Sequence, residues 1–134
     1  MGFAEYLDVC VKAEIPEHVP PGRVPQTVFW VVEDDRVVGM LRMRHRLNDY
    51  LRVKGGHIGY YIRPSARGRG IATEALGQAL RLLARMGERR AFLTTDPDNR
   101  GSIRVIEANG GSLAARAPDP DGLGVINQYW VSLT

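Results

Sequence analysis

Cysteine, long apolar runs and metal-ligand clusters are scarce or absent in this sequence. The single cysteine, Cys10, cannot form an internal disulfide. The opening stretch MGFAEYLDVC lacks the basic segment and the following apolar segment of a secretory leader. No stretch approaches the roughly 18 continuous apolar residues of a membrane span, and no His, Cys and carboxylate residues have metal-ligand spacing. The sequence therefore predicts a cytoplasmic protein with no membrane segment and no metal site.

Two common phosphate-binding signatures are also missing. The chain contains neither the P-loop pattern GxxxxGKS/T nor a GxGxxG pattern followed by an acidic residue about 20 positions later. The net charge of +3 nevertheless favours an anionic partner. The arginines are clustered and are not interleaved with aromatic residues, a distribution that favours a small, multiply charged ligand over nucleic acid.

The 134 residues, of which 44% are hydrophobic and 25% are charged, predict a single globular domain over residues 1–134. Their apolar patterns predict, in order, a helix over 3–13, a proline-rich segment, strands over 27–33 and 36–45, a strand over 55–63, a helix over 71–86, a strand over 90–96, a helix over 99–108, and strands over 112–116 and 125–133. The unit over 55–96 is a crossover, so its two strands should be parallel. We expect an α/β (α+β) fold with a mixed sheet and helices on its faces.

The stretch RPSARGRGIATEAL, residues 63–76, places two glycines and two arginines at the predicted start of the helix over 71–86. A helix start exposes unpaired N–H groups and carries a partial positive charge, so it can bind an anion. Gly68 and Gly70 let the backbone approach a bulky oxyanion, and Arg67 and Arg69 add positive charge. The stretch therefore predicts a pyrophosphate cradle; the alternative is a glycine-rich turn with solvated arginines.

Two motifs resemble those of the GNAT superfamily of acyl-CoA-dependent N-acetyltransferases. RGRGIA at residues 67–72 matches the Arg/Gln-x-x-Gly-x-Gly/Ala signature, and DNRGSIRVIEANGG at residues 98–111 is similar to the family's Asn-led helix that ends in a glycine pair. The resemblance covers residues 27–134. It implies a mixed, mostly antiparallel central sheet with helices on both faces and a parallel pair of strands that splay apart at the acetyl-CoA site.

The resemblance also implies which residues bind acetyl-CoA, the co-substrate. Pantetheine would pair with the strand that ends at Ile62, and Asn99 and Ser102 are candidate contacts to the coenzyme arm. Asn99 also suits a helix N-cap and Ser102 a first helical turn. The pyrophosphate would lie on the backbone of Arg67, Gly68, Arg69, Gly70, Ile71, Ala72 and Thr73.

The catalytic groups are less clear, because Ile106 occupies the position where many family members have a proton-donating tyrosine. Three residues are candidate substitutes. His57 titrates near neutral pH in its unperturbed state, although a lone histidine at a strand start is more often structural. Tyr60 and Tyr61 are neighbours on one strand and must face opposite sides of the sheet, so one of them can line the site.

The resemblance implies an N-acetyltransferase that acetylates a primary amine of a small molecule or peptide. Only 26 residues precede Thr27, fewer than the strand and two helices that family members usually have there, and this shortened region favours either an open acceptor site or a homodimer. One alternative is a non-catalytic acyl-CoA-binding or sensing module. The other is a small basic nucleic-acid-binding protein.

Overall fold

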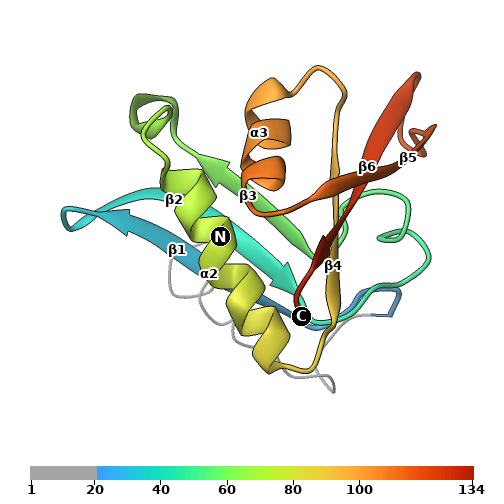
Figure 1. Ribbon diagram of the computed structural model, residues 1–134, viewed down its shortest axis with the longest axis horizontal. Coiled ribbons are helices and arrows are strands. Elements are labelled where there is room, and N and C mark those ends of the chain that lie inside the picture. Colours follow the sequence, from blue (N-terminus) through green and yellow to red (C-terminus); the bar gives the residue numbers. More distant parts are fainter. Residues whose placement is uncertain (1–20) are drawn as a thin grey trace.

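The computed structural model describes residues 21–134 (Figure 1). The predicted helix over 3–13 therefore lies outside the described residues. The described elements are β1 (Gln26–Glu33), β2 (Arg36–Arg44), β3 (Ile58–Ile62), the short 3-10 helix η2 (Pro64–Ala66), α2 (Ile71–Arg85), β4 (Arg90–Thr95), α3 (Arg100–Ala108), β5 (Ser112–Pro118) and β6 (Val125–Ser132).

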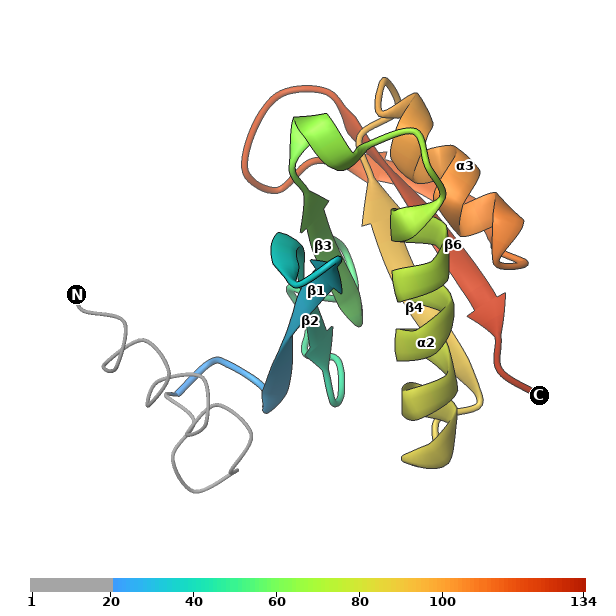
Figure 2. The same cartoon turned by 90° about the vertical axis from the view of Figure 1, so that its left-hand side faces the viewer.

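The strands form two antiparallel sheets of three strands, in the orders β1-β2-β3 and β4-β6-β5. Strands β3 and β4 meet where the sheets join, and they run in the same direction (Figure 2). They share no ladder; the backbone N–H of His57 donates to the carbonyl of Phe92 at 2.7 Å just before β3 begins. The predicted mixed α/β fold, with its splayed parallel pair, is confirmed.

The β1–β2 hairpin follows from its local sequence. β1 reads QTVFWVVE, a run of β-branched and aromatic residues that favours a strand. Asp34 and Asp35 have φ angles of 50° and 62°, the left-handed pair that a tight two-residue hairpin turn needs. The predicted strand over 55–63 is shorter than expected, because Gly55 and Gly56 have φ angles of 102° and 62° and cannot continue an extended strand.

Helices α2 and α3 lie next to each other on one face of the sheets (Figures 1 and 2). The apolar stripe of α2 is buried against the strands, and Ile106 of α3 belongs to the same core. The Asn109 side chain donates to the carbonyl of Thr73 at 3.2 Å and to that of Val105 at 2.9 Å, which ties the two helices together. Residues 21–134 place α2 and α3 on one face, so helices on both faces stay a prediction.

The loop between β2 and β3 packs on β4 and β6. The Gly55 N–H donates to Oγ1 of Thr94 at 2.9 Å, and the Gln128 side chain donates to the carbonyl of Val53 at 3.1 Å. Arg44 donates from Nη1 to the carbonyls of Gly55 and Gly56, each at 3.2 Å. Since side chains alternate along a strand, Thr94 faces away from the core side occupied by Leu93. The loop therefore covers the face opposite the helices.

Gly56→Ala should destabilise the protein by about 3 kcal/mol, because a Cβ at Gly56 would lie 2.2 Å from the carbonyl oxygen of Phe92 in a left-handed conformation. Chemical denaturation measures the loss. Gly124→Ala is the control, since Gly124 has φ +95 and nothing within 4 Å, and it should cost only about 1 kcal/mol. Equal losses in both variants would contradict close packing at this junction.

Candidate functional site

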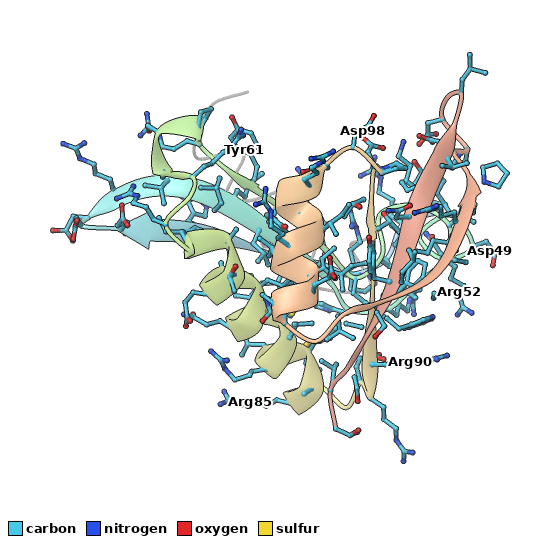
Figure 3. The ribbon with its side chains drawn as sticks, turned by 45° about the horizontal axis from the view of Figure 1, so that its top comes forward. Asp49, Arg52, Tyr61, Arg85, Arg90 and Asp98 are labelled. Carbon is cyan, nitrogen blue, oxygen red and sulfur yellow. The ribbon has the colours of Figure 1, made fainter. Side chains whose placement is uncertain are left out.

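A cleft of about 680 Å³ opens between the C-terminal end of β3, the start of α2 and helix α3. We call it the α2–α3 cleft. Figure 3 shows Tyr61 and Asp98 at this end of the molecule, whereas Arg85 and Arg90 lie at the opposite end. The cleft is lined by Tyr60, Tyr61, Ile62, Ala66, Arg67, Gly68, Gly70, Ile71, Ala72, Thr73, Asn99, Gly101, Ser102, Arg104 and Val105. It thus brings together most of the site residues predicted from sequence, while His57 and Arg69 are not part of its lining.

The start of α2 presents unpaired backbone N–H groups to this cleft. Gly68 and Gly70 have φ angles of 80° and 79°, and a Cβ on either would meet no atom within 4 Å. Within residues 21–134, no protein acceptor is recorded for the N–H groups of residues 68–73, whereas the Arg67 N–H donates to the carbonyl of Pro64. Open space, free amides and the positive end of the helix dipole fit an oxyanion such as a pyrophosphate.

The two arginines of the RGRG stretch point in different directions. Arg67 donates from Nε to the carbonyl of Ile62 at 2.8 Å, and its guanidinium lies 5.4 Å from the ring centroid of Tyr61. Arg69 pairs with Glu33 at 2.8 Å. It lines a second groove of about 410 Å³, between β1 and α2, that also contains Glu33 and Glu74. The Arg69 side chain therefore contributes its charge to the second groove and not to the α2–α3 cleft.

Asn99 and Ser102 fix the start of α3. The Asn99 side-chain oxygen accepts a hydrogen bond from the Ser102 N–H at 3.2 Å, which confirms the predicted N-cap. The Tyr60 hydroxyl donates to Oγ of Ser102, also at 3.2 Å, and so connects β3 to α3. Burial raises the pKa of Tyr60, so its hydroxyl stays protonated at neutral pH. Tyr61 projects to the other face of β3 and is exposed, but it also lines the cleft, where the Arg67 guanidinium lies over its ring.

His57 is buried and holds the junction of the two sheets. Its Nδ1 accepts the backbone N–H of Phe92 at 2.9 Å, so the proton of the neutral ring is on Nε2. Burial, with the nearby charges of Arg44 and Arg52, lowers the pKa of His57 to about 4. A neutral, hydrogen-bonded ring outside the cleft favours a structural role over a role as proton carrier.

Three further residues of α3 that line the cleft were not identified from the sequence. Gly101, Arg104 and Val105 also line the cleft. Helical spacing could have identified them, because residues three and four apart lie on one face of a helix. Ile106 faces the opposite way and is 1% exposed, so its side chain belongs to the core and cannot act in the cleft.

Neither a metal cluster nor a membrane-spanning helix occurs in the part of the chain that the structure describes. No group of three or more His, Cys, Asp and Glu residues there is arranged to hold a metal ion. Among residues 21–134, no helix has the length and apolar character to span a membrane.

Comparisons with known proteins agree with this geometry. The sequence model of the acetyltransferase (GNAT) family matches residues 5–110. No curated protein sequence matches the chain at a significant level.

Several solved structures share the fold. One is the yncA protein of Salmonella typhimurium, described as an acetyltransferase with its cofactor acetyl-CoA, at 16% identity and a TM-score of 0.73, covering 100% of this chain and 75% of that one. Another is RimJ of Mycobacterium smegmatis with CoA-disulfide, at 24% identity and a TM-score of 0.72, covering 96% and 61%. A third is a spermidine N-acetyltransferase chimera of Vibrio cholerae SpeG and hSSAT, at 14% identity and a TM-score of 0.67, covering 98% and 77%. At these identities the likeness establishes the fold.

The buried neutral state of His57 predicts a specific pH dependence of stability. The pKa of His57 is about 4 in the folded protein and about 6.5 in the unfolded chain, so the unfolded chain binds a proton first as the pH falls. As the pH falls from 6.5 to 4, protonation of His57 in the unfolded chain should therefore lower the free energy of unfolding by up to about 3 kcal/mol.

Urea denaturation across this range measures the effect. His57→Asn retains an acceptor near the position of Nδ1 but does not titrate, so its unfolding free energy should fall less steeply than that of the wild type. Parallel pH profiles in the two proteins would show that His57 is not held neutral.

Proposed function

The chain belongs to the GNAT acetyltransferase family, and from this membership we propose that it binds acetyl-CoA in the α2–α3 cleft and transfers the acetyl group to a primary amine. The observation that carries the proposal is the set of free N–H groups of residues 68–73 at the mouth of the cleft. The charged residues that line the cleft within residues 21–134, Arg67 and Arg104, are both cationic. The cleft therefore attracts a polyanion such as the coenzyme.

The assignments follow from the contacts of each wall. The N–H groups of residues 68–73 bind the pyrophosphate, while the engaged N–H of Arg67 stabilises the turn. The edge of β3 that faces β4 has no ladder beyond His57, so its backbone, up to Ile62, is available to the amides of pantetheine. On the α3 side, the same cleft is lined by Ser102 and by the side-chain NH2 group of the capping residue Asn99. When bound, acetyl-CoA supplies the activated acyl group.

Acyl transfer needs a proton for the departing thiolate as the new C–N bond forms and the C–S bond breaks. Tyr60 is the group in the cleft best suited to provide it, because its hydroxyl is protonated at neutral pH and is held by Ser102. The neutral amine attacks, its nitrogen releases a proton to solvent as the amide forms, and solvent returns a proton to the tyrosinate. We therefore assign the proton to Tyr60 of β3 instead of to a residue at position 106, and we assign no proton transfer to His57 or Tyr61.

The acceptor that we propose is a small molecule with a primary amine. One structure of similar fold is AAC(6')-Ib in complex with ribostamycin and coenzyme A, at 17% identity, and another is the spermidine acetyltransferase chimera. Ribostamycin and spermidine are both small molecules that carry several amino groups. They support the choice of an amine over other nucleophiles, and a coenzyme-saturated screen of amines identifies the acceptor.

A second candidate function is a non-catalytic acyl-CoA-binding module. The fully buried Ile106 favours it, since a core isoleucine stands where many family members have a proton-donating tyrosine. Thiol release from acetyl-CoA in the presence of an amine panel separates the two functions. An enzyme releases thiol in proportion to acetylated amine, whereas a sensor binds coenzyme without turnover.

Gly70→Asp should weaken CoA binding by at least about 100-fold, because it places a carboxylate where the pyrophosphate contacts the backbone. The variant should remain folded, since a side chain at Gly70 meets no atom within 4 Å. Isothermal titration with CoA measures the change. Gly87→Asp is the control: Gly87 also has a positive φ, +100, and open space, but lies at the other end of α2. Unchanged affinity in Gly70→Asp would contradict the coenzyme site.

Tyr60→Phe should lower kcat by about 100-fold while the Kd for CoA changes little, because only the proton-donating hydroxyl is lost. Steady-state kinetics with the identified amine and CoA titration give the two numbers. Ser102→Ala is the companion variant; it should lower kcat less, since it removes only the hydrogen-bond partner of Tyr60. A Tyr60→Phe enzyme with wild-type kcat would show that the proton comes from elsewhere.

A further inference from the structure

Arg104 is a cation on the α3 wall of the cleft that forms no ion pair within residues 21–134. It is exposed and lines the cleft, and its recorded hydrogen bond runs from Nε to the carbonyl of Arg100 in its own helix, at a long 3.4 Å. Among residues 21–134, no ion pair to Arg104 is recorded. The guanidinium is therefore available to a ligand.

The other cation of the cleft is already engaged. Arg67 donates to the carbonyl of Ile62 and lies over the ring of Tyr61. The second groove, in contrast, holds the carboxylates of Glu33 and Glu74 beside Arg69. Neither cation of the α2–α3 cleft has an ion pair within residues 21–134, but Arg67 is held by Ile62 and Tyr61. Arg104, on the wall opposite the glycines at the start of α2, is therefore the cation that can turn toward a ligand.

The two ends of the cleft differ in exposure. Tyr60 and Ser102 are partly buried, whereas Gly68 and Arg104 are exposed. If the acetyl thioester reacts at the buried end, then the nucleotide of the coenzyme must lie at the exposed end. There CoA carries a phosphomonoester on its ribose in addition to the pyrophosphate, and a phosphomonoester is a dianion that an arginine can bind through paired N–H groups.

We propose that Arg104 binds the ribose 3′-phosphate of the coenzyme and so makes the site selective for CoA over dephospho-CoA. This inference rests on the proposed function of the cleft. The free amides of residues 68–73 bind the pyrophosphate, which both molecules carry, so they cannot distinguish them. Arg104 adds a positive charge that binds the 3′-phosphate, the group that CoA carries and dephospho-CoA lacks.

The experiment is a set of isothermal titrations of CoA and dephospho-CoA at low ionic strength into the wild type, Arg104→Gln and Arg100→Gln. Arg100 is the matched control because it is an exposed arginine one turn earlier on α3 that does not line the cleft. Circular dichroism checks that each variant is folded. We expect the wild type and Arg100→Gln to bind CoA about tenfold more tightly than dephospho-CoA.

In Arg104→Gln the preference should disappear, because the affinity for CoA falls about tenfold while that for dephospho-CoA stays the same. Added salt should reduce the wild-type preference, since the contact is exposed. Equal loss for both ligands would place Arg104 on the pyrophosphate and overturn the inference, as would no loss for either. A wild type that binds neither ligand would overturn the proposed function as well, and this outcome is distinct from the other two.

Discussion

Two hydrogen bonds between His57 and Phe92 determine where the two sheets join and where they separate. The His57 N–H donates to the carbonyl of Phe92, and the Phe92 N–H donates to the imidazole of His57. The second acceptor is thus a side chain and not a backbone carbonyl, and β3 and β4 form no ladder. The facing edges of β3 and β4 beyond this point remain unpaired. An extended, amide-bearing ligand can pair with an edge of this kind, as an added strand would.

The second groove and the α2–α3 cleft, which both adjoin α2, differ in the charge of the residues that line them. Arg69 leans toward Glu33 in the second groove, while the α2–α3 cleft is lined by cations. The start of α2 thereby separates a groove that has two carboxylates and one guanidinium from a cleft that attracts anions. Because the free N–H groups of residues 68–73 open into the cationic side, backbone dipoles and side-chain charge act in the same direction there.

The elements and the glycine-rich turn could be predicted from sequence because their signals are local. The aspartate pair of the hairpin, the apolar stripe of α2 and the Asn99 cap all lie within a few residues of the structure they specify. The role of His57 could not be predicted, since its partner Phe92 is 35 residues away in the chain. The same limit applies to the pair between Arg69 and Glu33, which decides the direction of a side chain whose backbone position was expected.

The Asn109 side chain joins the first turn of α2 to α3, and Gly77 leaves room for it at that crossing. The C-terminal end of α3 is thereby attached to the first turn of α2. This contact restrains the two helices from moving apart. Any widening of the cleft is therefore left to the β3 side, where Tyr60 meets Ser102 through a single hydroxyl contact.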